Sequence, residues 1–202
     1  LLENPYATME TFFAISPIIL LIFIPALGMR TFSEEYNYGT IETILTKPIT
    51  ILQIILVKFL SILTLVLISI IPTIIYAYTI FLLGENSSSL DIGGIIGSYL
   101  GLILLSCVLI SISIFCSSIN NNQIIAFLSS IFLSIFIYYG FNFVSEIQML
   151  QQMSYMIKKF GIMFHYNMIS KGVIILSDLI YFISVTFFFI KITEHIIFKK
   201  QI

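Results

Sequence analysis

The sequence has very few charged residues. Asp, Glu, Lys and Arg make up 9% of its 202 residues, against about 25% in an ordinary soluble domain. Apolar residues reach 59% and the mean hydropathy is +1.09, so we expect an integral membrane protein. The net charge of −1 and the lack of any Lys/Arg cluster exclude nucleic-acid binding, which needs basic side chains to neutralise phosphates.

Reactive residues are also scarce. The two histidines, His165 and His195, lie too far apart for a shared metal site, and no H-E-x-x-H, G-x-S-x-G or Walker sequence occurs. We therefore expect no catalytic residue, no metal and no cofactor bound by this chain, and we interpret His165 as an interfacial hydrogen-bonding residue. Cys107 and Cys116 are separated by about 13 Å of helical rise, so they cannot form a disulfide with each other.

Long apolar runs are what the sequence does have. A helix needs roughly 20 apolar residues to cross a bilayer, and five segments reach that length. The predicted fold is all-α, a polytopic membrane helix bundle. A capping box of Thr50 and Gln53 should open the second segment and Pro72 should bend it. The expected spans are residues 12–29, 51–83, 92–115, 124–143 and 179–197.

The distribution of Lys and Arg predicts the orientation of these spans. Arg30, Lys47, Lys199 and Lys200 favour a cytoplasmic position for the loop near residues 30–50 and for the C-terminus. Five spans put the two ends of the chain on opposite faces. We therefore expect a further helix before Leu1, six spans in the whole protein, and a single transmembrane domain over residues 1–202.

Two further features bear on packing. Gly93, Gly97 and Gly101 form a ridge of small residues that lets helix backbones approach closely, either within this chain or at a seam with a second copy or half-transporter. The region 145–177 is too interrupted to span. We expect it to form short helices that lie at the interface on the outer side or dip into it, as a structural lid or as a gate.

Charge gathers in residues 29–50, which hold five of the 19 charged side chains (nine Lys and Arg plus ten Asp and Glu). "TIETILTK" (40–47) reads as a two-turn helix on the cytoplasmic surface. This helix either transmits a movement from outside the membrane to the membrane helices or is part of a solvated loop without a partner. The residues that define it are the turn residue Gly39, the N-cap Thr40, the acidic Glu42, the basic Lys47, the stop Pro48 and the apolar face Ile41, Ile44 and Leu45.

The same stretch resembles a known family. "MRTFSEEYNYGTIETILTKPITILQIILVKFL" (29–60) resembles the segment between the second and third helices of ABC-2 type permeases. "NNQIIAFLSSIF", "YYGFNF" and "FHYNMISKGVIILSDLIYFISV" are similar to the permease subunit of the gliding-motility-associated ABC transporter. The likeness covers nearly the whole chain except the family's first membrane helix.

The resemblance implies a permease half in the bacterial inner membrane that pairs with a second half, is surrounded by membrane lipid and docks on a cytoplasmic ABC ATPase subunit. ATP and Mg²⁺ would bind in that partner, so this chain is not expected to be an enzyme. An alternative is a non-transporting membrane scaffold that holds a cytoplasmic partner. The implied coupling segment, about residues 30–50, would contact the ATPase through Glu34, Glu35, Gly39, Thr40, Ile41, Glu42, Ile44, Leu45, Lys47 and Pro48.

Overall fold

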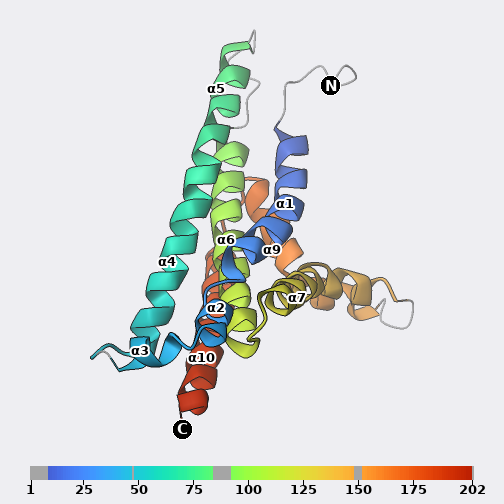
Figure 1. Ribbon diagram of the computed structural model, residues 1–202. Coiled ribbons are helices and arrows are strands. Elements are labelled where there is room, and N and C mark those ends of the chain that lie inside the picture. Colours follow the sequence, from blue (N-terminus) through green and yellow to red (C-terminus); the bar gives the residue numbers. More distant parts are fainter. Residues whose placement is uncertain (1–8, 47, 84–91, 148–151, 202) are drawn as a thin grey trace.

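The computed structural model describes residues 9–46, 48–83, 92–147 and 152–201, with backbone only at 44, 45, 80–83, 92 and 201. Throughout these ranges the regular structure is helical and no strand occurs. The all-α membrane bundle expected from the sequence is therefore confirmed. In Figure 1 the long helices α4, α6 and α10 run roughly side by side and α7 lies across them, with the short helices α2 (Ser33–Asn37) and α3 (Ile41–Leu45) and the C-terminus at one end of the bundle.

Five helical segments are long and apolar enough to cross a membrane. The second continues through a 3₁₀ turn at Ile71–Thr73 into α5 (Ile74–Leu83). The third and fifth run several residues beyond the predicted limits, because polar residues at their ends are held inside the bundle instead of ending the helix. The five are α1 (Glu10–Gly28), α4 (Ile51–Ile70), α6 (Ile92–Ile119), α7 (Gln123–Ser145) and α10 (Leu176–Gln201).

Local sequence signals explain the helix boundaries. The Thr50 side chain accepts the N–H of Gln53, whose side chain in turn accepts the N–H of Thr50, which confirms the predicted capping box. Pro72 lies in the 3₁₀ turn that joins α4 to α5, where a missing N–H costs little. Asn122 caps α7 by accepting the N–H of Ile124 at 2.8 Å.

Helix α6 is the centre of the molecule. Of its span, 72% is buried, compared with 22–44% of the other four. It packs against α1, α4, α7, α9 (Ile162–Ser170) and α10. Its serines are buried, and the hydroxyls of Ser106, Ser111 and Ser118 donate to carbonyls one turn back. The remaining spans present apolar side chains outward, as expected for a lipid-facing surface.

The region 145–177 contains two short helices, α8 (Ser154–Lys159) and α9 (Ile162–Ser170). Of these two helices, α9 is the one that enters the bundle. Its residues Ile162, His165, Tyr166 and Ile169 are buried, and it packs along α6 inside the bundle (Figure 1). The polar groups of α9 find their hydrogen-bond partners on neighbouring helices instead of in water. His165 is consequently a buried residue, and it makes the hydrogen bonds expected of it.

Candidate coupling site

The connecting segment, residues 29–50, leads from α1 to α4 across one end of the bundle. It contains α2 (Ser33–Asn37) and α3 (Ile41–Leu45). Gly39 joins them with φ of +69°, a left-handed conformation that favours glycine. No heavy atom lies within 4 Å of the position that a Cβ on Gly39 would take, so the glycine serves the turn and not close packing.

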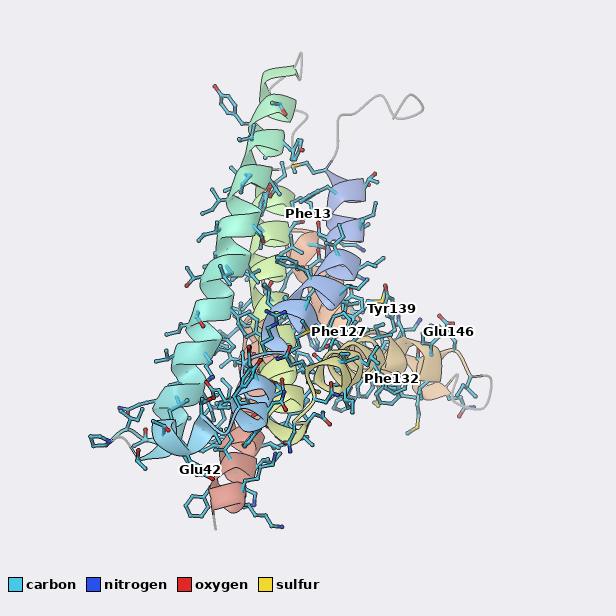
Figure 2. All side chains as sticks on the ribbon, viewed as in Figure 1. Phe13, Glu42, Phe127, Phe132, Tyr139 and Glu146 are labelled. Atoms are coloured by element: carbon cyan, nitrogen blue, oxygen red, sulfur yellow. The ribbon has the colours of Figure 1, made fainter. Side chains whose placement is uncertain are left out.

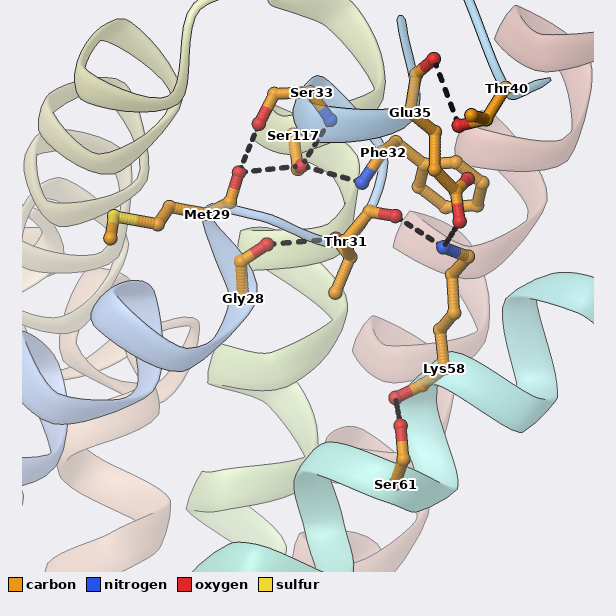
Figure 3. A network of polar contacts seen from close by, with 10 residues as sticks. All are labelled: Gly28, Met29, Thr31, Phe32, Ser33, Glu35, Thr40, Lys58, Ser61 and Ser117. Carbon is orange, nitrogen blue, oxygen red and sulfur yellow. Dashed lines mark hydrogen bonds and ion pairs between the residues drawn. The ribbon is translucent and has the colours of Figure 1, made fainter. Parts of the chain in front are cut away.

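The first part of the connecting segment is held on the end of α6 by Ser117 (Figure 3). The buried Ser117 hydroxyl accepts the N–H groups of Phe32 and Ser33 at 3.0 and 3.1 Å and donates to the carbonyl of Met29 at 3.0 Å. One side chain thus satisfies three backbone groups that the end of α1 and the start of α2 leave unpaired. This contact fixes the turn from α1 into α2.

Lys58 on α4 holds the same turn from another side (Figure 3). Its ammonium donates to the Thr31 carbonyl and to the Glu35 carboxylate, and it lies 4.5 Å from the centre of the Phe32 ring. The Lys58 and Glu35 side chains are only 18% and 20% exposed. The Lys58 side chain therefore folds back onto the protein, and Glu35 points inward.

Lys200 near the end of α10 makes the third attachment. Its ammonium donates to the carbonyls of Ser118 and Ile119 at 2.8 and 3.2 Å, which are at the C-terminal end of α6. It also lies 4.0 Å from the centre of the Tyr36 ring. A cation at a helix C-terminus is favourable because it meets the negative end of the helix dipole. The connecting segment is thus attached to α4, α6 and α10.

The remainder of the predicted coupling residues lie at the tip of the segment. Ile41 is buried at 8% exposure, whereas Glu42 and Pro48 are exposed; Figure 2 shows Glu42 at the end of the molecule. Tyr38, beside the Gly39 turn, is 70% exposed. The tip therefore offers one acidic and one aromatic side chain to solvent.

The structure does not describe three of the predicted coupling residues in full. The side chains of Ile44 and Leu45, expected to share a face with Ile41, and the whole of Lys47 lie outside the described residues. Glu34 is half-buried on α2. The Thr40 hydroxyl, expected to cap α3, donates to the carbonyl of Glu35 at 3.5 Å and so bonds back toward α2.

Sequence reasoning missed Lys58, Ser117 and Lys200 as partners of this segment. They lie 23 to 164 positions from the residues of the segment that they contact. The one available signal was Lys58 itself, a lone cation in the apolar run "ILVKFL", since such a residue normally needs a partner. Nothing in the pattern around Ser117 distinguished it from the other serines of α6.

The glycine ridge of α6 faces α9. A Cβ at Gly97 would lie 2.4 Å from the carbonyl oxygen of Ile169, and one at Gly101 would lie 3.4 Å from the Tyr166 ring. Gly93 meets Gly172, where a Cβ would lie 3.0 Å from the Gly93 carbonyl carbon. At these positions the small residues admit α9 to the bundle.

Metal-binding side chains are sparse in the described ranges. No group of three or more His, Cys, Asp or Glu side chains there is close enough to hold a metal ion. Cys107 and Cys116 are both free thiols on α6. The polar contacts of the connecting segment are the largest network of long-range polar contacts at this end of the bundle (Figure 3).

Comparison with known proteins agrees with this arrangement of helices and connecting segment. A family model described as ABC-2 family transporter protein matches residues 4–198. The chain belongs to the ABC-2 transporter family and is a membrane permease component of an ABC transporter. No curated protein and no solved structure matches it.

Proposed function

We propose that this chain is one half of an ABC exporter, in which the connecting segment receives the movement of a separate cytoplasmic ATPase. The observation that carries the proposal is the contrast within that segment. Its first part is fixed to α4, α6 and α10 through Lys58, Ser117 and Lys200, while its tip exposes Tyr38 and Glu42. A partner protein can bind the exposed tip, and the first part of the segment moves together with three helices. This arrangement suits the transmission of force.

The path of force follows from these contacts. A displacement of α3 passes through the Gly39 turn to α2, where Glu35 moves Lys58 and with it α4. The hydroxyl of Ser117 passes the same displacement to α6, the helix against which the rest of the bundle packs. A local push would in this way reorient whole helices, because packed helices move as bodies.

The remaining parts of the proposal rest on the resemblance in the sequence. The ATPase provides the ATP and Mg²⁺ chemistry, a second permease half completes the pathway, and the complex exports its substrate across a bacterial inner membrane. A role in gliding motility or secretion follows from the similarity of the segment "FHYNMISKGVIILSDLIYFISV". No Asp, Glu, Arg or His lies in the middle of any expected span, which suits a carrier driven by ATP better than one driven by an ion gradient.

The first test is Glu42→Lys. Because Glu42 is exposed, the variant should fold and insert normally, whereas the reversed charge should weaken docking of the ATPase. We expect at least a tenfold loss of substrate-stimulated ATP hydrolysis, which corresponds to about 1.4 kcal/mol. Asn121→Lys is the matched control, since it adds a cation at the same end of the bundle outside the connecting segment and should retain activity. Full activity of Glu42→Lys would exclude the proposed role.

A second measurement separates the permease from the scaffold. A single cysteine at position 42, with Cys107 and Cys116 replaced by Ala, should crosslink to the ATPase in a manner that changes when ATP binds. A crosslink that is insensitive to nucleotide would favour the scaffold. The absence of any crosslink in a folded, inserted sample would exclude docking through this segment.

A further inference from the structure

A buried pair of ionisable side chains lies away from the connecting segment. Nδ1 of His165 on α9 is 2.6 Å from Oδ1 of Asp178, which is in the first turn of α10. Their side chains are only 5% and 4% exposed. Ionisable groups within a membrane bundle are costly, and those present normally have a function. The coupling mechanism does not use this pair.

The hydrogen bonds determine how many protons the pair holds. Nε2 of His165 is 2.8 Å from the carbonyl oxygen of Lys159, and because a carbonyl only accepts, Nε2 must carry a proton. The 2.6 Å contact between Nδ1 and the Asp178 carboxyl needs a second proton, since two lone pairs would repel. The pair therefore shares one proton and has no net charge, whichever partner holds that proton.

The side chains around Asp178 do not compensate a charge on it, and the N-terminal end of α10 offsets that charge only in part. Its second oxygen, Oδ2, is buried and has no hydrogen-bond partner among the described residues. The ring of Tyr181 stacks on the imidazole at 4.1 Å, and its hydroxyl is used for the Phe160 carbonyl at 2.6 Å. Loss of the shared proton would leave a buried negative charge with an unpaired oxygen, which is strongly unfavourable.

Other titratable groups on the packed elements do not replace the shared proton. Among the described residues no ammonium or guanidinium is within ion-pair distance of Asp178. Lys159 contacts His165 through its carbonyl, and its side chain is exposed. The titratable side chains on the elements around the pair are Tyr155, Lys158 and Lys159 of α8, Tyr166 of α9, Tyr181 of α10, Tyr138 and Tyr139 of α7 with Glu146 just after it, and Tyr99, Cys107 and Cys116 of α6. The other titratable residues of α10 are Lys191, Glu194, His195, Lys199 and Lys200, which begin more than three turns beyond Asp178.

The pair is one of four side-chain attachments of α9 among the described residues, and in one of the others Asn142 on α7 donates to the Met163 sulfur at 3.0 Å. The Tyr166 hydroxyl donates to the carbonyl of Phe13 on α1 at 2.8 Å. The Ser98 hydroxyl on α6 donates to the carbonyl of Ser170 at 3.0 Å. Neither of these two contacts changes with protonation near neutral pH, whereas the contact to α10 through Asp178 depends on the shared proton.

We infer that His165 and Asp178 form a proton-binding site that latches α9 into the bundle, and that loss of the shared proton releases α9. The direction of the pH effect follows from the number of protons that the pair holds. At low pH the pair is neutral and fully hydrogen-bonded, so α9 stays docked. As pH rises and the proton leaves, the uncompensated carboxylate drives the pair apart, so α9 undocks from α10 and from the glycine ridge of α6.

The test measures exposure of a buried residue on α9. Ile169 is fully buried, so Ile169→Cys, with Cys107 and Cys116 replaced by Ala, reports undocking through its reaction with a polar maleimide. The protein is held in lipid nanodiscs, which give the reagent access to both faces. Since thiols react faster at high pH, the rate is divided by that of Lys171→Cys, an exposed position. We expect this ratio to rise at least fivefold between pH of about 5 and about 9.

Asp178→Asn is the matched control. The amide N–H of Asn can donate to Nδ1 while Nε2–H still donates to Lys159, so this variant keeps both contacts without a shared proton to lose. We expect a low ratio that does not change with pH, and a high ratio at every pH for Asp178→Ala.

Two results would overturn the inference. One is a ratio for the wild-type pair that is independent of pH. The other is an Asp178→Asn variant whose ratio rises with pH as the wild type does. The measurement on the wild-type pair can overturn the inference by itself, even where a variant fails to insert. Labelling requires no ATPase, so the outcome is independent of the proposed coupling function.

Discussion

At the scale of single residues, Lys58 combines contacts that sequence reasoning treats separately. It donates to a carbonyl and a carboxylate and lies against an aromatic ring. Partial burial strengthens these interactions because the local dielectric is lower than in water, and it makes an unmatched partner costly. The energetic role of Lys58 should therefore appear chiefly when only one member of the Lys58–Glu35 pair is removed.

We predict that Lys58→Met destabilises the protein by about 1–3 kcal/mol, because it leaves the Glu35 carboxylate largely buried without its cation. Adding Glu35→Gln should recover part of that loss, with a coupling energy of about 1 kcal/mol. The measurement is denaturant unfolding of the purified protein, with the exposed Lys199→Met as control. Strictly additive effects of the two substitutions would show that the ion pair has no energetic role.

At the scale of elements, the docking of α9 depends on the absence of side chains on α6. We predict that Gly97→Ala destabilises the protein by about 1–3 kcal/mol, because the added Cβ would lie 2.4 Å from a backbone oxygen that cannot rotate away. Gly140→Ala on α7 is the control, where the nearest atom is a ring carbon of Phe136 at 3.7 Å. That change should be neutral or stabilising. Equal thermal shifts would contradict the proposed packing.

The elements also show what the sequence could reveal. The five spans were predictable because length and hydropathy alone identify a membrane helix, and the Thr50 cap because it depends on residues three apart. The burial of α9 was not, since its polar residues find partners on α1, α6 and α10. Nor could the attachments of the connecting segment be predicted, because they join positions far apart in the chain.

At the scale of the whole molecule, the proposed orientation places the two ends of the bundle on different sides of the membrane. We predict that Tyr38→Cys reacts with an impermeant maleimide only in inside-out vesicles and Lys171→Cys only in right-side-out vesicles. Both positions are exposed, and Gly172, next to Lys171, meets Gly93 at the end of α6 opposite Ser117. Reaction of both variants in the same vesicles would refute this orientation.

The central position of α6 has a consequence for biosynthesis. Helix α6 carries buried serines along its length. Much of its surface is covered by α10, which is synthesised later. Until α10 emerges from the ribosome, part of the α6 surface faces lipid or the insertion machinery. A chain interrupted before α10 would therefore carry an open seam along α6 that quality-control proteases could recognise.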